Sequence, residues 1–113
     1  QGMDDFALFH ISRVFNVRAD KDSIRGQHAH RECTQLLVCS NGSIEVSCDD
    51  GETKSTHILN KPYRSLLILP GVWAEQKYLE NSSILTVLCD QPFNEEEYIR
   101  NYDEFKKYLM RNN

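Results

Sequence analysis

Short apolar runs separated by turn signals limit the possible folds of this chain more than any other feature. Up to about residue 90, β-branched or apolar residues gather in runs at Ile11–Val17, Gln35–Cys39, Ser43–Cys48, Thr56–Leu59, Ser65–Leu69 and Ile84–Cys89. Turn-forming pairs lie between these runs, among them Asn41-Gly42, Asp50-Gly51 and Pro70-Gly71. Many short strands at regular spacing predict a β-sandwich or β-barrel and argue against βαβ units.

The last part of the chain changes from a strand period to a helix period. Asn94 followed by Glu97 predicts a capping box at the start of a helix over about residues 95–110. Apolar side chains recur there at helical spacing, at Tyr98, Ile99, Tyr102, Phe105 and Leu109. Such a stripe could bind a partner, but packing on the chain's own sheet is the favoured interpretation. The predicted fold class is all-β, a small antiparallel barrel with a C-terminal α-helix.

Length and charge limit the possible functions. The 113 residues suit one domain, expected over residues 3–113, with Gln1 and Gly2 interpreted as a cleavage remnant before Met3. Thirteen Lys and Arg against seventeen Asp and Glu give a net charge of -4. A chain with this charge lacks the basic surface that binding to nucleic acids or anionic membranes requires. No apolar run approaches the roughly 20 residues of a membrane span, so we expect a cytoplasmic protein.

The four cysteines are expected to be reduced. Cys33, Cys39, Cys48 and Cys89 show no C-x-x-C spacing, and three of them lie within strand-like runs. Because a free cysteine behaves as a small buried hydrophobe, core thiols are favoured over disulfides or a zinc site.

Two of the four histidines form a His28-Ala29-His30 motif, after an expected turn at Arg25-Gly26 and before the predicted strand at Gln35. In an extended segment, residues two apart point the same way, so both imidazoles can enter one cavity. Taken alone, the motif is explained equally well by two surface histidines in a polar loop.

The spacing around the motif is that of a cupin, a small β-barrel that binds metal. Four residues separate His30 from Gln35, and six more precede Gly42, while Leu69-Pro-Gly-Val-Trp-Ala74 matches the second cupin segment. Gln35 stands where cupins have Glu, and Ala74 where they have the third His. A neutral amide is a poor ligand for transition metals and alanine is none, so we expect a cupin (jelly-roll) barrel without metal or other cofactor. The two imidazoles are then available for proton transfer.

The sequence also resembles a particular cupin family, the WxcM-like sugar-nucleotide 3,4-ketoisomerases. The resemblance runs from about Arg13 to the C-terminus and rests on Arg25-Gly-Gln-His-Ala-His-Arg31, Gln35-Leu-Leu-Val-Cys39, Asn41-Gly-Ser43, Asp49-Asp-Gly51, Pro70-Gly-Val-Trp73 and Glu97-Tyr-Ile-Arg-Asn-Tyr-Asp-Glu-Phe105. It implies a metal-independent homodimer that isomerises a dTDP-4-keto-6-deoxyhexose to its 3-keto isomer for bacterial surface glycans (lipopolysaccharide O-antigen), through an enediolate.

By the same resemblance, His30 is the expected principal base and His28 its acid partner, although the two could exchange roles. The expected substrate-binding residues are Arg25, Gln35, Arg13, Trp73 and Glu75. Three of these residues could instead have a purely structural role. Arg25 could lie in a solvated turn, Gln35 could belong to the inner wall of the barrel, and Trp73 could pack at the barrel mouth.

The chain departs from the family at two places that could concern catalysis. Ala74 replaces a histidine of many members, and Arg13-Val-Phe-Asn16 replaces an Arg-Val-Tyr-Tyr stretch, so a tyrosine hydroxyl is missing. Two alternatives therefore stay open. One is a non-catalytic, degenerate cupin that binds a sugar nucleotide or scaffolds a glycan-biosynthesis enzyme. The other is an epimerase, which shares the enolate step.

Overall fold

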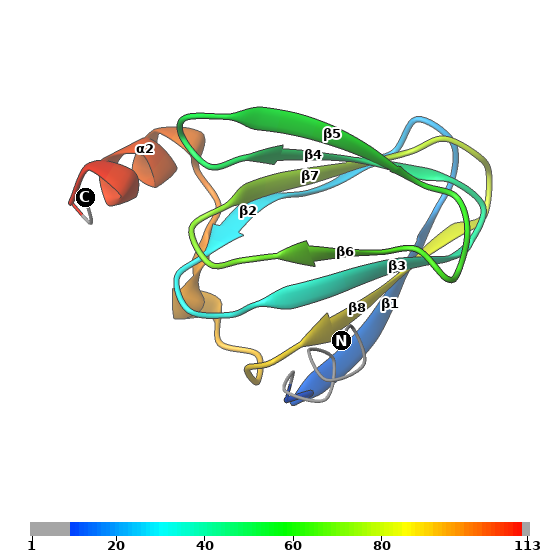
Figure 1. The fold of residues 1–113 in the computed structure, drawn as a ribbon, viewed down its shortest axis with the longest axis horizontal. Coiled ribbons are helices and arrows are strands. Elements are labelled where there is room, and N and C mark those ends of the chain that lie inside the picture. The colour runs from blue at the N-terminus through cyan, green and yellow to red at the C-terminus, as the bar shows by residue number, and fades with distance from the viewer. Residues whose placement is uncertain (1–9, 112–113) are drawn as a thin grey trace.

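The computed structural model describes residues 10–111, which form two facing antiparallel sheets with a helix at one end (Figure 1). The first sheet has the strand order β1 (Arg13–Ala19), β8 (Ser83–Cys89), β3 (Gln35–Asn41) and β6 (Ser65–Ile68). The second has the order β5 (Lys54–Leu59), β4 (Ile44–Asp49), β7 (Trp73–Tyr78), β2 (Ile24–His30) and β9 (Tyr98–Ile99). The predicted all-β fold class is confirmed. The expected cleavage remnant and the start of the domain at residue 3 lie outside the described residues.

The predicted turns connect the sheets in two ways. The turn at Asp50-Gly51 joins β4 to β5 within one sheet, whereas Asn41-Gly42 and Pro70-Gly71 carry the chain from one sheet to the other. Repeated crossing between two antiparallel sheets is the connectivity of a jelly-roll barrel.

The core lies between the sheets, and strand alternation supplies it from both sides. Leu37, Val46, Leu85 and Val87 are buried there, and Cys48 packs against them. Tyr78 is fully buried, and its hydroxyl donates to the carbonyl oxygen of Val17 at 2.9 Å. The hydroxyl thereby joins the two layers, because Tyr78 belongs to β7 and Val17 to β1.

All four cysteines are free, and three of them are buried. Burial raises the pKa of Cys33 to about 12, with neighbouring Cys89 adding to the effect, and burial also raises the pKa of Cys39 and Cys48. These three cysteines are neutral thiols at pH 7.

The predicted helix over about residues 95–110 is wrong in its first part. Glu95–Glu97 form a 3₁₀ turn (η1), Tyr98–Ile99 form β9, and the helix α2 spans Tyr102–Arg111. Asn94 caps only the 3₁₀ turn, while Asn101 accepts the N–H of Glu104 and caps α2. The pairing of β9 with Ala29 and His30 of β2 overrides the local helical pattern. The helix packs as expected, with Phe105 buried against Ala29, Trp73 and Ile99.

We predict that Gly42→Ala destabilises the barrel more than Gly71→Ala. Both glycines have a positive φ, 81° and 83°, which costs another residue about 1–2 kcal/mol. At Gly71 a Cβ atom would meet nothing closer than 4.0 Å, whereas at Gly42 it would lie 2.1 Å from Oγ and 3.0 Å from Cα of Ser83. Overpacking should therefore remove about 1–3 kcal/mol more from the free energy of unfolding in Gly42→Ala. Urea unfolding of both variants measures the difference, and equal losses would contradict the prediction.

Candidate active site

A β-bulge in β2 turns the two histidines toward the interior. The expected turn at Arg25-Gly26 is wrong, because β2 runs through it. Gly26 pairs with Glu75 of β7, but His28 pairs with the next residue, Ala74, so Gln27 is an extra residue in the strand. Gly26 and Gln27 both have positive φ, 81° and 56°. Without the extra residue, strict alternation would point His28 to the outer face.

His28 is a neutral imidazole with a free nitrogen. Its Nδ1 lies 3.0 Å from the carbonyl oxygen of Gly26, and since a carbonyl only accepts, Nδ1 carries the proton and Nε2 the lone pair. Burial and, second, the charge of neighbouring His30 lower the pKa of His28 from 6.5 to about 4. At pH 7 this ring is in the form that can take a proton.

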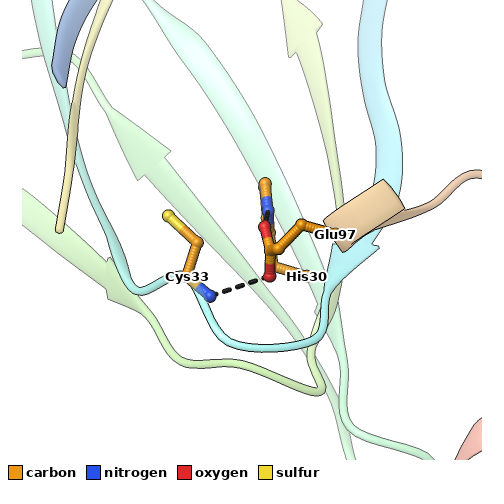
Figure 2. A group of neighbouring side chains, drawn as sticks. All are labelled: His30, Cys33 and Glu97. Carbon is orange, nitrogen blue, oxygen red and sulfur yellow. Dashed lines mark hydrogen bonds and ion pairs between the residues drawn. The ribbon is translucent and has the colours of Figure 1, made fainter. Parts of the chain in front are cut away.

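His30 is held from behind by a carboxylate (Figure 2). Its Nδ1 lies 2.6 Å from Oε1 of Glu97, and the side chain is only 4% exposed. The other oxygen of Glu97 accepts the backbone N–H groups of Glu32 and Cys33, at 2.5 and 2.8 Å. Nε2 of His30 is buried and has no hydrogen-bond partner among residues 10–111.

Aromatic rings and two arginines surround the histidine pair. The rings of His28 and His30 meet edge-on at 4.9 Å, and Tyr98 lies 5.0 and 4.4 Å from them. Arg13 donates to the Tyr98 hydroxyl at 3.2 Å, and the Arg100 guanidinium lies 4.3 Å above the Tyr98 ring. Both arginines therefore contact Tyr98, and Arg100 is also ion-paired with Glu95, at 2.6 and 2.9 Å.

His28 lines a cavity of about 340 Å³ between the two sheets. Of the residues predicted to bind substrate, Arg25 and Gln35 also line it, together with Gln76 and Arg100. Gln35 is buried, and its amide donates to the Cys89 sulfur at 3.4 Å, whereas the two arginines are exposed. The cavity thus combines an apolar wall with amides inside and cations at its mouth, as small-molecule sites do.

The structure does not bring Trp73 and Glu75 together with the histidines. In β7, Ala74 and Gln76 face the interior, so alternation turns residues 73 and 75 to the outer face. There the Trp73 indole N–H donates to Glu75 at 3.0 Å, and both line a separate groove of about 440 Å³ beside α2. Arg13 lies at the histidine cluster through Tyr98 and is not among the residues that line the cavity.

The donor atoms near the histidines do not fit a metal. His30, Cys33 and Glu97 bring possible ligand atoms within 4.8 Å of one another in the described part of the chain. However, both Glu97 oxygens already accept hydrogen bonds, and the raised pKa keeps Cys33 a thiol, whereas a metal binds thiolate. At the cupin positions, Gln35 offers a neutral amide and Ala74, opposite His28, no donor atom.

Sequence reasoning missed Glu97, Tyr98 and Arg100 as residues of this region. Glu97 was assigned to a helix cap and Tyr98 to a helix face. The two-residue alternation of Tyr98, Ile99 and Arg100 before the capping residue Asn101 is the local signal for a short strand. The pairing of that strand with β2 has no local signal, because Glu97 lies 67 positions after His30 in the sequence.

A two-sheet jelly-roll with a His-x-His motif turned inward defines a barrel of the cupin class. The chain belongs to the WxcM-like, C-terminal family (FdtA), whose model matches residues 3–110. It is 39% identical over 106 residues to the TDP-4-oxo-6-deoxy-alpha-D-glucose-3,4-oxoisomerase of Aneurinibacillus thermoaerophilus, covering 93% of this chain and 76% of that protein.

Solved structures agree with this assignment. A 3,4-ketoisomerase from Helicobacter canadensis superposes with a TM-score of 0.86 at 38% identity, over 90% of this chain and 77% of the other. A sugar 3,4-ketoisomerase from Thermoanaerobacterium thermosaccharolyticum, solved with TDP, gives a TM-score of 0.85 at 34% identity, over 90% and 75%. A variant of that enzyme was solved with TDP-4-keto-6-deoxyglucose. Within residues 10–111 we find no helix long and apolar enough to cross a membrane.

We predict that His28 makes the fold less stable at mildly acidic pH. Its pKa falls from 6.5 to about 4 on folding, so between these values the unfolded chain binds more protons. The free energy of unfolding should therefore fall as the pH drops from about 6.5 to about 4, by at most about 3 kcal/mol.

Urea unfolding of the wild type and of His28→Asn across this range measures the effect. The Asn amide can keep the bond to Gly26 but does not titrate. The stability difference between the two proteins should change with pH in this window, and a constant difference would contradict the lowered pKa.

Proposed function

We propose that this protein is a sugar-nucleotide 3,4-ketoisomerase, an isomerase that converts a dTDP-4-keto-6-deoxyhexose to its 3-keto isomer. The observation that carries the proposal is a neutral His28, with a free Nε2, at the wall of an interior cavity. The relatives that act on or bind TDP sugars support this choice of substrate.

The isomerisation needs a group that can take and return a proton at neighbouring carbons. In our proposal, Nε2 of His28 takes the C3 proton, and the electron pair of that bond forms the C3–C4 double bond while O4 becomes the enediolate oxygen. O3 then loses its proton and becomes the carbonyl oxygen, while C4 gains a proton. O4 is also protonated and becomes a hydroxyl, which gives the 3-keto product. We therefore assign the principal base to His28 rather than His30, because His28 lines the cavity and His30 is buried behind it.

Cations and amides at the cavity are proposed to bind the nucleotide sugar. Arg25 at the mouth suits a diphosphate or the enediolate oxygen, because guanidinium groups bind such anions through paired donors. Arg100 already donates to both carboxylate oxygens of Glu95, at 2.6 and 2.9 Å. Gln35 and Gln76 offer amide groups to the sugar's hydroxyl or keto oxygens. Arg13 is proposed to act on substrate through Tyr98, whose hydroxyl it contacts.

The wider setting is proposed on the family assignment. The reaction needs no metal, because the histidine pair supplies its acid and base and the donor set at the site does not fit one. The product would serve bacterial surface-glycan biosynthesis, such as that of O-antigen, in the cytoplasm. Binding of nucleic acid is not expected for a chain with a net charge of -4.

We predict that the protein produces the 3-keto sugar from dTDP-4-keto-6-deoxyglucose, as measured by NMR of the product. His28→Asn should lower kcat by about 10²- to 10⁴-fold, the usual contribution of a general base. Glu75→Gln, on the outer face of the same sheet, should keep kcat within about threefold.

The other outcomes point to the alternative functions. Tight binding without turnover on a panel of dTDP- and UDP-keto sugars would favour the non-catalytic cupin. The missing tyrosine at Phe15 and the missing histidine at Ala74 are the sequence features that support this alternative. Inversion at C3 with return of the proton to the same carbon would identify an epimerase.

We also propose that the protein is a homodimer that associates through its four-stranded sheet. Val14, Leu88, Leu36 and Leu67 lie directly opposite one another across β1, β8, β3 and β6. Their neighbours in each strand face the core, so this row faces outward, with Val14 57% and Leu67 50% exposed. An apolar row on an outer sheet face suits a self-complementary interface, which the family resemblance also implies.

We predict sedimentation as a species of twice 13.2 kDa. Leu67→Lys should weaken this association, because it places a charge in the exposed apolar row while leaving the core intact. Met110→Lys, on the exposed face of α2 and 79% exposed, is the matched control and should not change the mass. A wild type that stays monomeric at about 100 μM would contradict the proposed interface.

A further inference from the structure

Glu97 makes contacts that a surface carboxylate at the start of a helix would not make. It lies in the 3₁₀ turn η1, yet its side chain is only 12% exposed. One oxygen accepts from His30 at 2.6 Å, and the other accepts the N–H groups of Glu32 and Cys33 in the loop after β2. Hydrogen bonds to both oxygens fix the plane of the carboxylate against the imidazole (Figure 2).

This arrangement determines which nitrogen of His30 carries the proton. A carboxylate only accepts, so Nδ1 of His30 must donate to it, and Nε2 is left with the lone pair in the neutral ring. Nε2 is buried, without a hydrogen-bond partner in the described part of the chain. The His28 ring meets the His30 ring edge-on, 4.9 Å away.

The carboxylate also keeps a negative charge beside the pair. Burial raises the pKa of Glu97, but the N–H of Glu32 and the hydrogen bond from His30 lower it by more, so the net pKa lies below its usual value. The cations that face the pair are Arg13, across Tyr98, and Arg100, at the cavity mouth. Arg100 is itself ion-paired with Glu95, at 2.6 and 2.9 Å. Glu97 is the carboxylate in hydrogen-bond contact with the pair, through His30.

Resting on the isomerase function proposed above, we propose that Glu97 is a positioning residue for the histidine pair. It holds His30 in the Nδ1–H form and stabilises positive charge on the pair while the sugar's proton is held there. The C3 proton moves to Nε2 of His28, its bonding electrons move toward O4, and the resulting imidazolium is stabilised by the Glu97 carboxylate until the proton returns at C4. Glu97 itself stays ionised and touches no substrate.

Glu97→Gln separates this role from a structural one. The amide oxygen can still accept the N–H groups of Glu32 and Cys33, but the amide nitrogen can only donate to Nδ1 of His30. The proton of the neutral ring should then move to Nε2, which ¹⁵N NMR of the free protein reports directly. In the isomerase assay, kcat should fall by about 10²- to 10⁴-fold, as when the carboxylate behind a catalytic histidine is neutralised, while KM changes by less than about threefold.

Glu96→Gln is the matched control, since the Glu96 side chain is exposed and the variant removes the same charge one residue away. It should change neither the His30 tautomer nor kcat, and Glu97→Asp should recover part of the activity. A wild-type His30 with its proton on Nε2, or a Glu97→Gln variant with wild-type tautomer or wild-type kcat, would overturn the proposal.

The outcomes also separate this inference from the proposed function. A wild type that turns over the keto sugar together with an unaffected Glu97→Gln variant rejects the role of Glu97 and leaves the isomerase. A wild type without turnover rejects the isomerase, and the tautomer of His30, measured without substrate, still decides whether Glu97 positions the ring. If Glu97→Gln does not fold, the tautomer of His30 in the wild type decides the question: a proton on Nδ1 supports the role of Glu97, and a proton on Nε2 rejects it.

Discussion

The site depends on one irregularity in β2, the extra residue at Gln27. A strand has a side-chain period of two, so a shift by one residue exchanges its two faces. Because the bulge lies between Gly26 and His28, both histidines face the interior, opposite Ala74 and Tyr98. Gly26 adopts the required positive φ without strain, and a Cβ there would lie 2.5 Å from the Gln76 amide oxygen. The cavity wall and the histidine orientation thus arise from the same short stretch.

A second constraint acts at the end of the barrel. The segment after β8 returns to β2 and adds β9, which places Glu97 behind His30 and Tyr98 beside both imidazoles. One imidazole then faces a cavity in neutral form, and the other is held against a carboxylate. Different surroundings give two like groups different proton chemistry, which is the usual way a fold separates acid and base roles.

Much of the fold could be predicted from local pattern. The runs that became β1, β3, β4, β5, β6 and β8 were recognisable from β-branched residues and turn pairs. The helix start was wrong because three acidic residues after Asn94 suit a helix N-terminus equally well in isolation. The strand pairing that decides against a helix there joins residues far apart in sequence, so no local pattern reveals it.

The sequence by itself determined the fold class, the family and the His28/His30 pair, because periodicity, turn residues and motif spacing are local properties of the chain. Only the tertiary structure decided which residues share a site with the pair. It turned Trp73 and Glu75 to the outer face, since strand alternation fixes their side once Ala74 faces in. It also brought Glu97 to His30, 67 positions apart in the sequence, since buried hydrogen-bonding groups must find partners wherever the sheet places them.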